Sequence, residues 1–125
     1  MERDYRLTRK IRHGGNNHNG LARLVPANDQ IADLARAMLE LDNMDEAYRF
    51  FEDIFTIHEL QAVAQRLAGA RLLQKKVTYQ EIAERTGAST ATISRVNRCL
   101  TYGAGGYQLI LGKTKFGDET SEDNP

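Results

Sequence analysis

Apolar residues recur at helical spacing from about residue 28 to about residue 111. In the first segment Ile31 is followed by apolar residues three, four, seven and eight positions later, at Leu34, Ala35, Met38 and Leu39. On a helix these positions form a single apolar stripe. A second helix is expected from about Asn43, burying Ala47, Phe50, Phe51 and Ile54. No stretch alternates as a strand does, so the pattern predicts an all-α domain of five or six helices.

Two capping boxes mark further helix starts. In Thr56-Ile57-His58-Glu59 the threonine can accept the amide of Glu59 while the glutamate reaches back to the threonine amide. This box opens a long helix that is expected to end near Lys75. Thr78 and Glu81 form the second box and open a short helix that must stop before Gly87.

Gly87 separates two helical segments, 78–86 and 89–101. A reversal at this point favours glycine, which has no Cβ to oppose a left-handed backbone. Ala83 is small where the two helices would cross, and Ile93 and Val96 are placed to pack the second helix on the first. These features at this spacing predict a helix-turn-helix, with Ser89 as N-cap of its second helix.

The outer face of that second helix has short polar and basic side chains. With Ile93 and Val96 directed inward, the outward set is Ser89, Thr90, Ala91, Ser94, Arg95 and Arg98. Small side chains let a helix enter a major groove about 12 Å wide, and hydroxyl and guanidinium groups can contact bases or phosphates. The pattern predicts a helix that reads double-stranded DNA.

Charge is unevenly distributed although 17 Lys and Arg balance 17 Asp and Glu. Residues 75–98 hold five cations against two acids, whereas residues 28–74 hold four against nine. A basic segment within an acidic body favours a directed contact with an anion. Residues 1–27 are expected to be a flexible basic arm, and residues 112–125 an acidic, disordered tail.

The apolar content exceeds what a thin bundle can cover. Phe50, Phe51 and Phe55 lie close together in sequence, and exposing several such side chains creates an adhesive patch. A homodimer would cover them; a compact monomer is the alternative.

Three segments carry a family resemblance: FEDIFTIHELQAVAQRLAGARLL (51–73), TYQEIAERTGASTATISRVNRCL (78–100) and YGAGGYQL (102–109). They resemble the Trp-repressor superfamily, specifically its YerC/YecD-type branch. The resemblance implies six helices in an intertwined homodimer that binds a palindromic operator and represses transcription. It also implies that Tyr79 and Gln80 face DNA, together with Thr90, Ala91 and Ser94.

An effector pocket is also implied by the resemblance. In the Trp repressor two arginines and a threonine hold tryptophan, and their counterparts here are Arg66, Arg95 and Thr56. The chain departs from that pattern at Val96, where the Trp repressor has glycine, and at Cys99, where it has serine. The added valine carbons put the room for tryptophan in doubt, so no cofactor is expected, with tryptophan or another small effector as the alternatives. Arg66 could instead form an ion pair with Glu59 or with an acid across the dimer.

Other classes have less support. A helix-turn-helix used only to bind another protein is the main alternative, although Arg95 and Arg98 argue against it. The sequence shows no nucleophile, acid and base that would converge in an active site, so an enzyme is not expected. His13 and His18 lack the further ligands of a metal site. No apolar run is long enough to span a membrane, so a cytoplasmic protein is expected.

Overall fold

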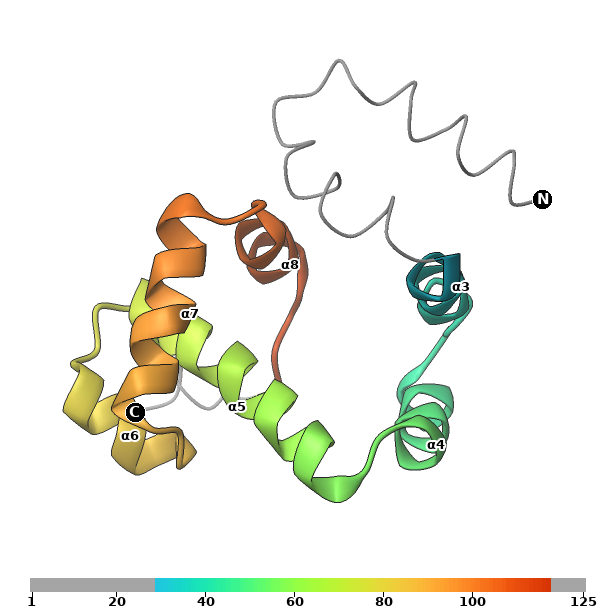
Figure 1. Ribbon diagram of the computed structural model, residues 1–125, viewed down its shortest axis with the longest axis horizontal. Coiled ribbons are helices and arrows are strands. Elements are labelled where there is room, and N and C mark those ends of the chain that lie inside the picture. Colours follow the sequence, from blue (N-terminus) through green and yellow to red (C-terminus); the bar gives the residue numbers. More distant parts are fainter. Residues whose placement is uncertain (1–28, 118–125) are drawn as a thin grey trace, which may run out of the picture. The chain divides into compact units, whose positions relative to one another are not determined.

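The computed structural model describes residues 29–117, which form six helices and no strand (Figure 1). The all-α prediction is therefore confirmed. The helices are α3 (Asp29–Met38), α4 (Met44–Ile54), α5 (Ile57–Gln74), α6 (Tyr79–Thr86), α7 (Thr90–Tyr102) and α8 (Gly106–Lys113). The predicted arm at 1–27 and the last eight residues of the predicted tail lie outside the described residues, whereas α8 continues two residues past position 111.

The chain divides into two units between Arg66 and Leu67, within α5. The first described unit contains α3, α4 and the N-terminal part of α5. The predicted cap at Thr56 is present, since its hydroxyl accepts the Glu59 amide at 3.1 Å, and Asn43 caps α4 by accepting the Glu46 amide at 2.9 Å. The Glu59 carboxylate in turn accepts the Thr56 amide at 2.9 Å, which completes that capping box.

Most apolar side chains in the described part of the first unit are not enclosed. The expectation that α4 buries its apolar face is wrong for the single chain: Ala47, Phe50 and Phe51 are half-buried and Ile54 is 45% exposed. On α3 only Ala32 is buried, while Ile31, Leu34 and Met38 are exposed, as is Leu39 directly after the helix. Two short helices and part of a third supply too few side chains to close a core around these residues.

The second unit has a closed core. Leu72 of α5, Ile82 of α6, Ala88 in the turn and Ile93 of α7 pack together, with Leu73, Val77 and Ala83 against them. Ile82 and Ile93 are completely buried. Each is expected to contribute about 1.5–3 kcal/mol relative to an exposed position. This cluster fixes α7 on α6 and α5.

The C-terminus of α5 ends in a left-handed residue that is not glycine. Lys76 has φ 67°. Its amide donates to the Leu73 carbonyl at 3.0 Å, and the Val77 amide donates to the Leu72 carbonyl at 3.1 Å. These two bonds are the pair that closes a Schellman motif, in which glycine usually holds the left-handed position. They satisfy the terminal carbonyls of α5 and turn the chain toward α6.

Helix α8 is attached to α7 by a side-chain contact. The Gln108 side-chain amide donates to the Leu100 carbonyl.

Among the helices of residues 29–117, none is both long enough and apolar enough to cross a membrane.

Candidate nucleic-acid interface

The turn between α6 and α7 begins with the predicted left-handed glycine. Gly87 has φ 80° and ψ 0°, and its amide donates to the Ala83 carbonyl at 2.9 Å. A residue with a Cβ would be strained at this φ. The geometry confirms why the chain places a glycine between two helices: α6 must end here and reverse direction.

Thr86, directly before Gly87, also stabilises this turn through its side chain, a role not predicted from the sequence. Its hydroxyl donates to the Ile82 carbonyl at 2.8 Å and accepts the amide of Ala88 at 3.1 Å. Ala88 is 5% exposed and belongs to the core cluster. Thr86 therefore provides a hydrogen-bond partner for the backbone amide of a buried core residue. The available signal was a hydroxyl residue directly before a predicted helix-terminating glycine.

Ser89 caps α7 as predicted. Its backbone is extended (φ −73°, ψ 157°), and its side chain accepts the Thr92 amide at 3.1 Å. The Ser89 hydroxyl also donates to the Thr92 hydroxyl at 3.0 Å. Because these bonds engage the serine side chain, Ser89 fixes the start of the helix and satisfies one of its first-turn amides.

Helix α7 presents two distinct faces. Ile93 is fully buried and Val96 is 2% exposed. The outward positions are all exposed: Ser89, Thr90, Ala91, Ser94, Arg95 and Arg98. The inward and outward sets are therefore separated as predicted, and no side chain of the outward set is packed inside the unit.

The start of α6 and the residues before it supply further exposed groups. Tyr79 is 37% exposed and Gln80 is exposed, directly after the Thr78 cap that accepts the Glu81 amide at 3.2 Å. Lys75 and Lys76 are exposed just before this helix. On α6, the Arg85 guanidinium lies 3.6 Å from the Glu81 carboxylate, so part of its charge is compensated locally.

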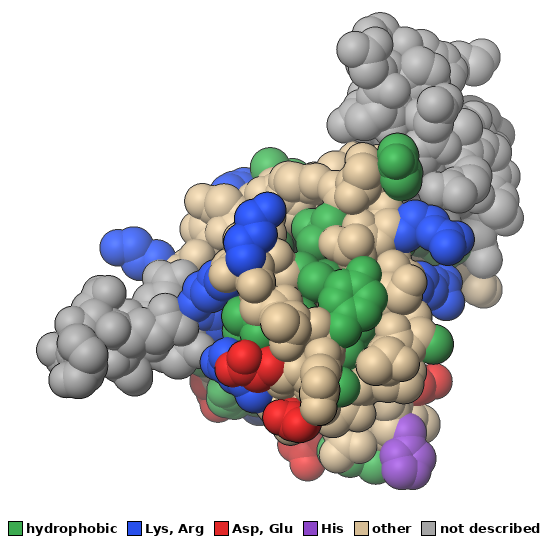
Figure 2. Space-filling view, turned by 90° about the vertical axis from the view of Figure 1, so that its left-hand side faces the viewer, with side chains coloured by type: hydrophobic (Ala, Val, Ile, Leu, Met, Phe, Trp, Pro, Cys, Tyr) green, Lys and Arg blue, Asp and Glu red, His purple; other side chains and the backbone are tan. Residues whose placement is uncertain are grey.

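Figure 2 shows the molecule from the left-hand side of Figure 1, where α6 and α7 are drawn. Lys and Arg side chains stand out separately on this face, and the visible acidic side chains gather toward its lower part. A patch of hydrophobic side chains lies near the centre of the view, and uncharged polar and backbone atoms surround it. Separated cations on a largely uncharged surface suit contacts to individual phosphates.

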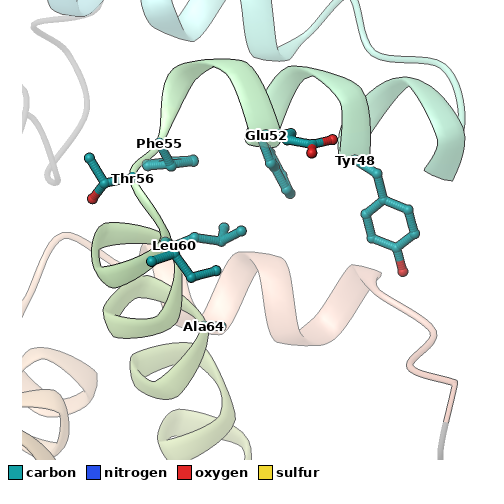
Figure 3. A pocket seen from close by; sticks show the side chains of 8 residues that line it. Tyr48, Glu52, Phe55, Thr56, Leu60 and Ala64 are labelled. Carbon is teal, nitrogen blue, oxygen red and sulfur yellow. The ribbon is translucent and has the colours of Figure 1, made fainter.

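The first unit contains a separate apolar hollow of about 660 Å³ between α4 and the start of α5. Phe55 and Leu60 border it in Figure 3, with Tyr48 and Glu52 on the α4 side. Thr56 also lines the hollow, and its hydroxyl is already engaged in the helix cap.

The residues proposed for an effector pocket divide between the two units. Thr56 and the exposed Arg66 belong to the first, and the others to the second. There, Arg95 and Cys99 are exposed while Val96 is buried. Glu59, considered as an ion-pair partner for Arg66, accepts the Thr56 amide. The effector pocket stays a prediction. The described residues contain no cluster of three or more His, Cys, Asp or Glu suited to a metal ion.

Comparison with known proteins decides the family. The family model described as Trp repressor protein matches residues 29–115, which include all six described helices. The chain belongs to the Trp repressor family. The resemblance read from its three sequence segments is thereby confirmed.

Relatives within the Trp repressor family support the YerC-type branch. The uncharacterised protein YerC of Bacillus subtilis (strain 168) is 49% identical over 86 residues, covering 69% of this chain and 83% of YerC. A solved TrpR-like protein from Eubacterium eligens ATCC 27750 is 47% identical with a TM-score of 0.65, covering 72% of this chain and 96% of that one. A candidate Trp repressor from Staphylococcus aureus is 42% identical with a TM-score of 0.66, covering 69% and 86%.

Proposed function

We propose that this chain is a sequence-specific DNA-binding regulator of transcription, acting as a repressor that binds a palindromic operator as a homodimer. The family supports a helix-turn-helix regulator. The observation that carries the proposal is the division of α7, whose buried Ile93 and Val96 anchor the helix while Thr90, Ser94 and Arg98 are exposed.

The exposed set suits direct reading of bases. Thr90, Ala91 and Ser94 are small, so that the N-terminal half of α7 can approach the floor of a major groove. Hydroxyl groups at Thr90 and Ser94 can bond base edges. Arg95 and Arg98 lie further along the helix and have the reach to contact phosphates or guanine.

The start of α6 is assigned to the DNA backbone. Tyr79 and Gln80 stand at the N-terminus of this helix, where amides and short polar contacts favour phosphate. Lys75 and Lys76 precede them and add two positive charges. Together these groups position the motif, and α7 supplies the specificity.

A homodimer explains the open surface of the first unit. The exposed apolar residues of α3 and the hollow between α4 and α5 give this unit an extensive apolar surface. A second copy of the chain would cover this surface and place two copies of α7 on one duplex. Half-sites are then expected about one helical turn apart, roughly 34 Å.

The proposal is tested by selecting bound duplexes from a random pool with the full-length protein. Recovery of a palindrome is expected. Titration of the selected duplex at increasing salt should show affinity falling linearly on a log–log plot, because bound phosphates release counterions. A module that binds only protein would recover no consensus and show no salt-dependent DNA affinity, and that outcome would refute the proposal.

The same selection with and without tryptophan tests the effector. Val96 is a branched, buried side chain, and its counterpart in the Trp repressor is a glycine. We therefore expect the same palindrome and the same affinity in both arms. A consensus recovered only with tryptophan would instead assign Arg66, Arg95 and Thr56 to a ligand pocket.

A further inference from the structure

The chain folds back onto the end of α5 after α8. Residues 114–117 leave α8 at Thr114, whose amide donates to the Ile110 carbonyl at 3.0 Å. The Arg71 guanidinium lies over the ring of Phe116, with 3.8 Å between the guanidinium carbon and the ring centroid. A cation above an aromatic ring at this distance is attracted to the π-face. The contact brings the C-terminal segment to the last turn of α5.

A small polar hollow lies at this contact. Its volume is about 210 Å³, and its lining residues are Arg71, Gln74, Lys75, Leu111 and Phe116. Two of these residues are cations, and Lys76 follows directly in sequence. The hollow therefore adjoins the basic end of α5, which we define as Arg71, Lys75 and Lys76. Lys76 lies three positions before Tyr79, where the first helix of the helix-turn-helix begins.

The eight residues that follow Gly117 are strongly acidic. The sequence DETSEDNP contains four carboxylates and no Lys or Arg. Its first acid, Asp118, is only two positions from Phe116. Eight residues can span at most about 26–29 Å when extended. The basic end of α5 is thus within reach, and the tether gives the carboxylates a high local concentration, on the order of millimolar.

We propose that residues 118–125 bind the basic end of α5, at Arg71, Lys75 and Lys76, and compete there with DNA phosphates. The Arg71–Phe116 contact directs the tail to this site. The competition rests on the proposed DNA-binding function, because Lys75 and Lys76 adjoin the start of α6. The tail lowers affinity for any duplex without altering base preference, since it acts on backbone contacts.

The tail contact is tested first without DNA, on the full chain. The tail variant neutralises its four acids, as Asp118→Asn, Glu119→Gln, Glu122→Gln and Asp123→Asn. Amide spectra of the unaltered chain and this variant should differ at residues 71–76 at about 50 mM salt and converge at about 500 mM, where charges are screened beyond a few ångströms. Identical spectra for residues 71–76 at the lower salt would overturn the contact.

The competition is tested next by DNA affinity. The tail variant should bind a random duplex about 3–10 times more tightly at about 50 mM salt, and less than about 1.5 times more tightly at about 300 mM. A matched control makes the same change of net charge on exposed acids of the first unit, as Glu40→Gln, Asp42→Asn, Asp45→Asn and Asp53→Asn. An equal gain in this control would overturn the proposal in favour of a general charge effect.

The two tests separate the tail contact from the proposed function. DNA binding of equal strength in the unaltered chain and the tail variant would overturn the competition and leave the DNA-binding function intact. Spectral differences at residues 71–76 without DNA binding by any form would refute the DNA-binding function and, with it, the competition.

Discussion

The amide of Ala88 donates to the Thr86 hydroxyl at 3.1 Å, across the left-handed Gly87. Because Ala88 is 5% exposed, its amide has little access to water as a substitute partner. The Thr86 hydroxyl also donates to the Ile82 carbonyl at 2.8 Å. One side chain thus joins the last turn of α6 to the residue at which the chain re-enters the core.

Thr86→Val is expected to destabilise the protein by about 1–2 kcal/mol, since valine has the same shape but leaves the Ala88 amide unpaired. Urea unfolding monitored by circular dichroism measures the loss. Thr86→Ser keeps the hydroxyl and should recover most of it. If valine and serine were equally stable, the Thr86 hydrogen bonds would contribute nothing to the turn.

Lys76→Gly is expected to raise stability by about 0.5–1 kcal/mol, because glycine adopts the φ of 67° without a Cβ penalty. The same change should weaken DNA binding and reduce the magnitude of the salt slope by about 1, since one phosphate contact is lost. Unfolding midpoints and binding isotherms measure the two effects separately.

Lys75→Gln is the control for charge. It removes the neighbouring cation without changing the left-handed residue, so it should weaken binding but give no gain in stability. A stability loss on Lys76→Gly would contradict the Schellman geometry at the end of α5.

Substitutions of Ser89 separate capping from DNA contact. Ser89→Asp retains an N-cap and should change stability by less than about 0.5 kcal/mol. Its negative charge at the start of α7 should repel phosphate and lower affinity about tenfold or more at low salt. Ser89→Asn keeps the cap without the charge and should bind DNA nearly normally. Equal affinity of the two variants would place the start of α7 away from DNA.

Ser94 and Arg98 are expected to have different effects on binding. Ser94→Ala should change which bases are preferred at one position of each half-site, and Arg98→Ala should weaken binding to all sequences alike. Selection from a random pool measures preference, and titration of a fixed duplex measures affinity. If neither substitution changed DNA binding, the assigned reading face would be wrong.

Leu34→Glu is expected to disrupt the homodimer, because it places a charge within the exposed apolar stripe of α3. Sedimentation at micromolar concentration should show the mass of a monomer. Arg36→Gln changes the net charge by the same amount, at an exposed residue that pairs with Asp33 at 2.8 Å, and should leave the dimer intact. An unaltered chain that sediments as a monomer would refute the dimer itself.

Local chemistry made much of this fold predictable from the sequence. The caps at Thr56, Thr78 and Ser89 were found because each hydroxyl precedes a helical pattern by a fixed offset. Gly87 was predictable because one residue type dominates left-handed helix ends. The buried positions Ile93 and Val96 followed from their spacing relative to that glycine.

Other features depend on tertiary context and were missed or misjudged. The end of α5 was predicted near Lys75, but its left-handed residue was not, because a lysine at φ 67° breaks the local preference for glycine at such a position. Burial of Ile54 was predicted from periodicity, yet periodicity identifies an apolar face without identifying what covers it. The Phe116–Arg71 contact joins positions far apart in sequence and leaves no periodic signal.

The two faces of α7 share no residue: Ile93 and Val96 hold the helix in place, and Thr90, Ala91 and Ser94 project from it. Mutations in the second set can therefore accumulate without weakening the scaffold. On the proposed DNA-binding function, this division would let a lineage acquire new target genes by exchanging a handful of surface side chains, and it would make the motif a suitable framework for engineered recognition of chosen DNA sites.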